Sequence, residues 1–312
     1  MANIPFLRRF REGLTLSGLT ALAIGATGLQ AVQPRPQQEQ RPTNQQRVYV
    51  SVVDKKGAPV TTLAVTDLTV KEDGVTREVL SVEPAKEPMQ MAILVDTSAA
   101  SAAAISDLRT SIKTFAAEIW AKSPDTQIAL YSFGARPTLE ADYSTSPTNL
   151  NRRVERLFTV SDSGATFIDA VIEVSGGLKK RGATRPVIVA YVDENGAEFS
   201  HRRHDVAFNA LADARASLWV VARQGFASST ATAENRERAM VIGDVTTRTG
   251  GRSSMVFDGS AIKGRLSEMA TQLLSQLVVT YGRVATLVPP EKLEMRLVNQ
   301  DLRLASPRWT TR

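Results

Sequence analysis

The chain has 312 residues and a formal net charge of +6, with 43% hydrophobic residues, 22% charged residues and no cysteine. The absence of cysteine excludes disulfide bonds, thiolate metal sites and cysteine nucleophiles. The first 47 residues hold six arginines and two glutamates, so the remainder carries only +2, too little to indicate the dense phosphate contacts of a nucleic-acid-binding protein.

The amino-terminal residues have the order of a secretory signal. Arg8, Arg9 and Arg11 precede an uncharged stretch at 14–32 that is rich in small residues. We therefore predict a signal peptide at 1–32 and a secreted, periplasmic or cell-envelope location. Retention of this leader as a membrane anchor is the alternative, although Gly, Ser and Thr dilute its apolar part. Residues 33–46 are rich in Pro and Gln and predict a flexible linker.

Short β patterns occur near both ends of the chain. They lie at 48–53, 68–72 and 78–82, and Asp73-Gly74 between the last two predicts a hairpin. Three such strands are too few to be stable alone. We therefore expect the amino-terminal β segment at 47–87 to pair with a carboxyl-terminal β segment at 284–312, which has strand patterns at 284–288, 293–298 and 302–305.

Strand and helix patterns alternate in the long middle region, 88–283. Apolar strand patterns are at 89–95, 127–133, 186–192, 218–222 and 254–257. Helical periodicity marks 101–121, 148–157, 167–180, 205–216, 233–249 and 262–274, and 276–282 is extended. This alternation predicts an α/β fold of the Rossmann-like kind, with a mostly parallel central sheet covered by helices on both faces.

Polar residues follow several of these strands. Asp96, Ser98 and Ser101 come after the first apolar strand, Thr166 opens a helix, and Asp193 ends the strand at 186–192. The carboxyl ends of parallel strands share one edge of a sheet, so these side chains are expected to gather there. Carboxylate and hydroxyl oxygens suit a hard cation such as Mg²⁺.

The chain resembles a von Willebrand factor A (VWA) domain, and is most similar to the secreted bacterial VWA-related family often labelled the acidobacterial type. The resemblance spans about residues 46–310. It rests on the order of several short motifs, among them Asp54-Lys-Lys-Gly-Ala-Pro-Val60, Val70-Lys-Glu-Asp-Gly74, Ile93-Leu-Val-Asp-Thr-Ser98, Gly164-Ala-Thr166 and Thr249-Gly-Gly251.

This resemblance implies a metal-ion-dependent adhesion site with the pattern Asp-x-Ser-x-Ser, a Thr and an Asp. Asp96, Ser98, Thr166 and Asp193 match it, whereas the second Ser falls on Ala100, which has no ligand oxygen. The site is therefore predicted to be degenerate. Water or Ser101, one residue late, could supply the missing ligand, and the alternative is a polar loop cluster that holds no metal.

A second polar group, His201-Arg-Arg-His204, follows Asp193. It lacks the glutamate of the zinc-protease signature, and we interpret it as the solvated start of a helix. In the functional alternative, Arg202 and Arg203 rim the site, where they attract an acidic partner or replace the charge of the metal. The sequence has no Gly-x-Ser-x-Gly elbow either, so we do not expect an enzyme.

These features together predict a protein-binding module of the adhesion type, secreted or in the cell envelope. It would use the degenerate site with Mg²⁺, and a carboxylate of the protein partner would complete the metal shell. The alternative is a metal-free scaffold or interaction domain that uses the same loop edge. We expect no nucleic-acid partner, and membrane contact only through an uncleaved leader.

Overall fold

The computed structural model describes residues 43–224, 232–284, 290, 292–305 and 308–309, which belong to one compact unit. The predicted signal peptide, most of the predicted linker and most of the predicted strand at 284–288 lie outside these residues. Within the described residues, no helix is long and apolar enough to cross a membrane.

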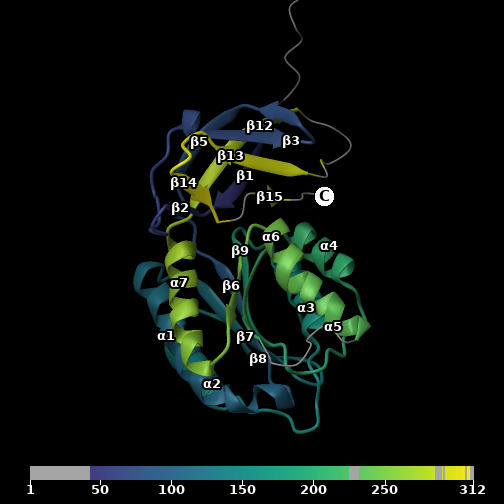
Figure 1. The fold of residues 1–312 in the computed structure, drawn as a ribbon. Coiled ribbons are helices and arrows are strands. Elements are labelled where there is room, and N and C mark those ends of the chain that lie inside the picture. Colours follow the sequence, from purple (N-terminus) through teal and green to yellow (C-terminus); the bar gives the residue numbers. More distant parts are fainter. Residues whose placement is uncertain (1–42, 225–231, 285–289, 291, 306–307, 310–312) are drawn as a thin grey trace, which may run out of the picture. The chain divides into compact units, whose positions relative to one another are not determined.

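A six-stranded sheet lies at the centre of the α/β part (Figure 1), in the order β11-β10-β9-β6-β7-β8. Neighbouring strands are parallel except β8, which runs antiparallel to β7 at one edge. The middle strands are almost entirely buried, as expected when helices cover both faces. The predicted α/β architecture is therefore confirmed. The strands are β6 (Gln90–Val95), β7 (Gln127–Phe133), β8 (Pro137–Ser144), β9 (Pro186–Asp193), β10 (Ser217–Arg223) and β11 (Ser253–Val256).

Two groups of helices cover the two faces of this sheet (Figure 1). Met91, Ile93 and Val95 of β6 point into one core, which contains apolar residues of α1 (Ile105–Lys122), α2 (Pro147–Val154) and α7 (Ile262–Leu274). The alternate residues, Ala92 and Leu94, point into the second core with α3 (Phe167–Lys180) and α4 (His204–Ala214). This alternation follows from the two-residue period of a strand.

The remaining strands build a small β unit of three sheets. The first contains β1 (Thr43–Val50), β12 (Leu277–Val284) and β5 (Val79–Pro84). In the second, β13 (Leu293–Leu297) lies between β3 (Leu68–Glu72) and β15 (Arg308–Trp309), and β3 also pairs with β4 (Val75–Arg77). The third pairs β2 (Val52–Asp54) with β14 (Leu302–Leu304). One apolar core joins the sheets, and it includes Val50, Val52, Val70, Leu277, Val279, Tyr281, Leu293 and Met295.

Several boundaries differ from the sequence-based predictions in this β unit. We assigned 276–282 to the α/β domain, but β12 pairs with β1 and β5 instead, because its alternate apolar residues pack into the core of the β unit. We ended the linker at residue 46, yet β1 already begins at Thr43, opposite Val284. The amino-terminal strands are also divided among three sheets. Asp73-Gly74 does form a hairpin turn, and both residues have the positive φ that such a turn needs. Its second strand is β4, however, and not the predicted strand at 78–82, which belongs to β5 and pairs with β12 in another sheet.

Other differences lie in the α/β part. The sequence patterns missed β8, whose residues are mostly half-exposed and show little alternation. The predicted helix at 101–121 begins with a separate 3₁₀ turn, Ala99–Ala103, before α1. The predicted helix at 233–249 consists of α5 (Ala233–Met240), a π-helical turn at Val241–Val245 and α6 (Thr246–Arg248).

Candidate functional site

The candidate site lies where β6 and β9 end side by side. From β6 the chain continues to β7 on one side, whereas β9 continues to β10 on the other. In open α/β sheets, ligands commonly bind at such a point, where the strand order reverses. We call the two loops that begin at Asp96 and Asp193 the crevice. The backbone N–H of Asp96 donates to the carbonyl of Tyr191 at 3.1 Å, so the two strand ends are held in register.

Asp96 ties the two loops of this crevice together. Its side chain is fully buried, and Oδ1 accepts the N–H of Ser98 at 2.8 Å while Oδ2 accepts the N–H of Asp193 at 3.0 Å. Burial raises the pKa of the Asp96 carboxyl, and the hydrogen bonds oppose that shift. The carboxylate therefore acts as a structural acceptor for backbone groups of both loops.

Asp193 is also fully buried, and both of its oxygens are engaged. Oδ1 accepts from the backbone N–H and the side-chain amide of Asn195, at 3.1 and 2.8 Å. Oδ2 accepts from the Tyr191 hydroxyl at 3.2 Å and from Arg223 Nε at 2.7 Å. Arg223 Nη2 also donates to the carbonyl of Ala100 at 3.1 Å. A guanidinium thus joins the Asp193 carboxylate to the loop position that lacks the second Ser of the adhesion motif.

The position of Arg223 follows from sheet register. It ends β10, the parallel neighbour of β9, and pairs directly with Asp193. Because the two residues lie side by side at the ends of neighbouring strands, the arginine side chain reaches the carboxylate directly. The functional alternative for Arg202 and Arg203 was that they replace the charge of the metal, but in the structure Arg223 is the arginine paired with Asp193.

Two predicted hydroxyl ligands have unused hydrogen-bonding capacity. Ser98 and Ser101 are fully buried, and neither hydroxyl has a hydrogen-bond partner in the described structure. Such orphaned groups are uncommon and call for an explanation, which a bound water or ion would give. Thr166 is used differently, since its hydroxyl donates to the carbonyl of Gly134 at 3.2 Å. The direct hydrogen bonds therefore connect Asp96, Ser98 and Asp193 but leave Thr166 outside.

These residues, as arranged here, do not fit a divalent cation well. Mg²⁺ takes about six oxygen ligands. Ala100 offers no side-chain oxygen, the oxygens of Asp96 and Asp193 already accept six N–H or O–H donors, and Arg223 neutralises the second carboxylate. No group of three or more His, Asp or Glu side chains in the described part of the chain is placed to hold a metal. The Mg²⁺ site thus remains a prediction that this arrangement does not favour.

A second buried pair, which the sequence patterns did not indicate, supports the loop after Asp193. Arg238 on α5 is completely buried and donates to the carbonyls of Gly196 and Glu194 at 2.9 and 3.1 Å. Its Nη1 lies 4.0 Å from Oε2 of Glu198, which is also buried. Burial outweighs the nearby guanidinium and raises the pKa of Glu198 to about 7. The sequence of α5 is largely polar, so no apolar period marked Arg238 as an interior residue.

The His-Arg-Arg-His group lies at the start of α4. His204 Nδ1 is 2.5 Å from Glu237 Oε2, and Arg203 Nε is 3.5 Å from the other oxygen of Glu237. His201 and Arg202 are exposed. The group therefore joins the start of α4 to α5, and the N–H of His201 donates to Asp169 of α3 at 3.1 Å.

Exposed apolar side chains surround the polar crevice. Phe158, Phe199 and Phe257 are 71%, 57% and 71% exposed. Phe158 lies in the loop that bonds to the first crevice loop through the N–H of Val160, which donates to Thr97. Phe199 follows Glu198, and Phe257 directly follows β11 at the same edge of the sheet. Exposed aromatic side chains are enriched at protein-binding surfaces.

Comparisons with known proteins give structural neighbours only. No family model and no curated protein matches the sequence. A von Willebrand factor type A protein from Catenulispora acidiphila is similar in structure, with a TM-score of 0.47, 10% identity and coverage of 88% of this chain and 75% of that one. The vWF domain of the type V pili tip protein Mfa5 from Porphyromonas gingivalis has a TM-score of 0.43 and 9% identity, over 61% of this chain and 96% of that one.

A mutant of the PilB minor pilin from Streptococcus sanguinis is a third similar structure. Its TM-score is 0.43 and its identity 12%, over 61% of this chain. The match spans 62% of the pilin chain, less than two thirds of its length.

Proposed function

We propose that this chain is a protein-interaction module that binds a protein partner at the carboxyl-end edge of its six-stranded sheet, without a bound metal. The observation that carries the proposal is the pair formed by Arg223 and the buried Asp193, at 2.7 Å. It places a cation of the chain itself against the carboxylate that a metal would otherwise need to neutralise. The two carboxylates of the crevice therefore have all their partners within the chain, and they form the rigid centre of a binding surface.

The surface around this centre supports binding to a protein. The three exposed Phe side chains project from separate loops, and each loop is fixed by backbone hydrogen bonds or by the end of a strand. Phe199 is the best anchored, because its N–H donates to Ala165 and its ring lies against Gly164, where a Cβ would be 2.6 Å from Phe199 Cδ2. Rigid aromatic side chains lose little conformational entropy on binding, which favours them as anchors.

Capture experiments test the partner-binding surface. The tagged full chain would be used to capture proteins from the native envelope, with and without EDTA. We expect the double variant Phe158→Ser/Phe199→Ser to lose at least tenfold in captured partner, and EDTA to have no effect. The matched control is Val75→Ser, which changes an exposed apolar residue of the β unit, 54% exposed. Equal capture by all three proteins would refute the proposed surface.

The metal-dependent alternative has one observation in its favour, the orphaned hydroxyls of Ser98 and Ser101. In that version Asp96, Ser98, Thr166 and Asp193 hold Mg²⁺ directly or through water, and a partner carboxylate completes the shell. Calorimetry distinguishes the two. We expect no heat from Mg²⁺ or Mn²⁺ with the unmodified chain, and metal binding after Ala100→Ser/Arg223→Ala, which restores a ligand and removes the internal cation. Heat from the unmodified chain that Ser98→Ala abolishes would establish the metal-dependent version.

We also propose that the protein binds without catalysis. Both acidic side chains of the crevice are occupied by hydrogen-bond donors, which leaves them poorly placed to act as a nucleophile or base. Screens for phosphatase and esterase turnover should give no activity above background. Turnover that is lost in Asp96→Asn would overturn this part of the proposal.

A secreted or envelope location is a further part of the proposal, and only the composition of residues 1–32 supports it. Cell fractionation of the full chain, followed by amino-terminal sequencing of the mature protein, tests it. Recovery in the cytoplasm with an intact leader would contradict it.

A further inference from the structure

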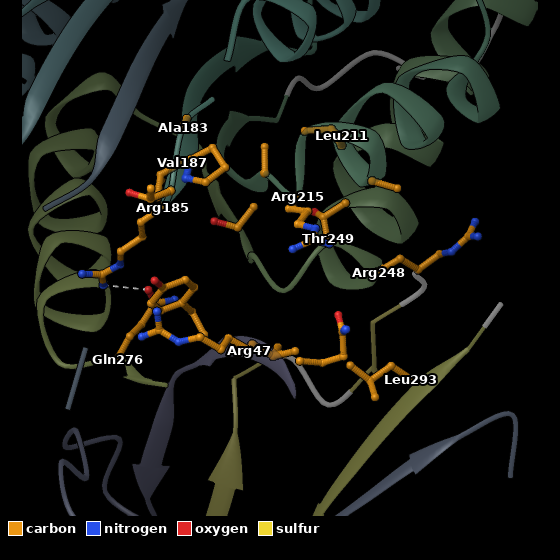
Figure 2. A pocket seen from close by; sticks show the side chains of 18 of the residues that line it. Arg47, Ala183, Arg185, Val187, Leu211, Arg215, Arg248, Thr249, Gln276 and Leu293 are labelled. Atoms are coloured by element: carbon orange, nitrogen blue, oxygen red, sulfur yellow. Dashed lines mark hydrogen bonds between the residues drawn. The ribbon is translucent and has the colours of Figure 1, made fainter. Parts of the chain in front are cut away.

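A cleft (Figure 2) lies at the amino-terminal starts of β9 and β10, whereas the site described above lies at the carboxyl ends of β6 and β9. It has a volume of about 420 Å³ and is lined by the amino-terminal starts of β9 and β10, the last residues of α4 and α6, and residues of β1, β12 and β13. All of these belong to the same compact unit. The volume falls in the range of small-molecule sites, roughly 300–1,000 Å³.

The charged residues that line the cleft are all of one sign. Five arginines contribute to its wall, and no Asp or Glu is among the residues that line it. The arginines are Arg47, Arg185, Arg215, Arg248 and Arg283. Polar groups of Gln46, Tyr49, Thr184 and Ser217 lie among them, and Val48, Pro186, Leu211 and Leu293 add apolar surface.

Three of these arginines form ion pairs with acidic side chains that do not themselves line the cleft. Arg47 pairs with Glu87, Arg248 with Asp244 and Arg283 with Glu72. The other two lack such a partner. Arg185 is buried and bonded to the carbonyls of Glu87 and Leu273 and to the amide oxygen of Gln276, all uncharged acceptors. Arg215 has no carboxylate within ion-pairing distance in the described structure, and it is exposed.

The backbone at Arg215 singles this residue out. It caps the carboxyl end of α4 in the left-handed conformation, with φ of 54° and ψ of 32°. Glycine is the usual residue at such a cap, because any side chain is disfavoured there. An arginine at a helix carboxyl end commonly serves only to offset the helix dipole, but that role does not require the left-handed position. Backbone strain of this kind is found preferentially at functional sites.

We propose that the cleft binds a small organic oxyanion, with a carboxylate or phosphate group held by Arg215 and an apolar body packed against the apolar part of the wall. Arginine suits both groups because its planar fork donates two parallel hydrogen bonds. Arg47, from β1 of the β unit, faces the same cleft (Figure 2), and Arg283 of β12 also lines it. Arg185 is a buried structural support, because its guanidinium already donates to the carbonyls of Leu273 on α7 and of Glu87 in the segment before β6.

The experiment uses the full chain and defined probes. Phenyl phosphate and phenylacetate supply an oxyanion on an apolar body, inorganic phosphate supplies the anion alone, and benzyl alcohol supplies the body without charge. Calorimetry should show binding of at least one of the two organic anions, weaker binding of inorganic phosphate and none of benzyl alcohol. The organic anion that binds more tightly identifies the group that the cleft prefers.

Arg215→Gly separates a binding role from a structural one. The variant removes the guanidinium and relieves the left-handed backbone, so we expect its melting temperature to stay the same or rise while affinity for the organic anion falls at least tenfold. Arg215→Lys should retain part of the affinity. The matched control is Arg181→Ala at the end of α3, outside the cleft, which should bind as the unmodified chain does.

Three results would overturn the proposal. The first is no binding of either organic anion by the unmodified chain. The second is equal affinity of the unmodified chain and Arg215→Gly. The third is an equal loss in Arg181→Ala, which would indicate a general effect of positive charge. None of these outcomes bears on the aromatic surface at the other edge of the sheet.

Discussion

The two edges of the six-stranded sheet treat charge in opposite ways. At the carboxyl-end edge, Asp96 and Asp193 are buried, and every carboxylate oxygen accepts at least one hydrogen bond. At the amino-end edge, five arginines line a cleft in whose wall no acid takes part. The acidic cluster that the sequence indicated is therefore satisfied within the structure, whereas two arginines without an acidic partner among the described residues, Arg185 and Arg215, line a cleft that no sequence pattern indicated.

The difference has a physical origin. A buried charge is tolerated only when partners compensate it, so the carboxyl-end edge had to supply its own cation and donors. An exposed arginine costs little to leave unpaired because water solvates it. The charged groups at the carboxyl-end edge therefore stabilise the fold, whereas the amino-end edge has arginine donors that remain available for a ligand.

Arg238→Ala should be the most damaging change at the carboxyl-end edge. It removes two hydrogen bonds to the loop carbonyls and leaves Glu198 buried without its cation. We expect the free energy of unfolding to fall by about 3–5 kcal/mol, as for other broken buried pairs. Urea denaturation measures this. Arg236→Ala, an exposed position on the same helix, is the control and should change stability by less than about 0.5 kcal/mol.

The pH dependence of stability should carry the signature of Glu198. Its pKa is raised to about 7 in the folded chain from the ordinary value of 4.5. Between these values the folded state binds more protons than the unfolded state, so the stability contributed by this group is full below about pH 4.5 and is lost as the pH rises through 7. We expect a loss of about 2–3 kcal/mol between pH 5 and pH 8.

The raised pKa values of Asp96 and Glu194 act in the same direction. The control for Glu198 is therefore Glu198→Gln, which should flatten part of this pH dependence without abolishing it. Urea titrations of both proteins across the pH range provide the measurement. Identical pH profiles for the two proteins would show that Glu198 ionises normally.

Arg223→Gln tests whether the internal cation matters to folding. It removes the charge opposite the buried Asp193, but Arg223 itself is 18% exposed, so water can compensate in part. We expect a loss of about 1–2 kcal/mol in the free energy of unfolding. Thermal and urea unfolding in the absence of divalent cations measure it. An unchanged free energy of unfolding would mean that the charge of Arg223 is not needed for folding, and the contrast between the carboxyl-end edge and the cleft would be lost.

Arg215→Gly should have the smallest effect on stability, and of the opposite sign. Relief of the left-handed backbone is worth about 1–2 kcal/mol, and the extra chain entropy of glycine in the unfolded state offsets about 0.5–1 kcal/mol. We therefore expect a gain of less than about 1 kcal/mol. A clear loss would show that Arg215 contributes to folding and would remove the contrast between the two edges.

Much of the fold was predictable because it depends on local patterns. The buried strands β6, β9 and β10 are continuous apolar runs, and α1 shows the three-to-four-residue spacing of a helix with one buried face. The hairpin at Asp73-Gly74 follows from the two residue types alone. By contrast, β8 was missed because a half-exposed edge strand carries little apolar alternation, and the place of β12 depends on distant pairing partners.

The candidate site divides in the same way. The sequence by itself determined that Asp96, Ser98 and Asp193 meet at one edge, because parallel strands bring their carboxyl ends together. Only the tertiary structure decided what compensates them, since Arg223 is 30 residues from Asp193 in sequence and reaches it through strand register. The same holds for the arginine cleft, whose wall combines the starts of β9 and β10 with residues of β1, β12 and β13. The residue types of a candidate site can be recognised in short segments of the sequence. The pairing of charges depends instead on contacts between distant segments, which only folding brings together.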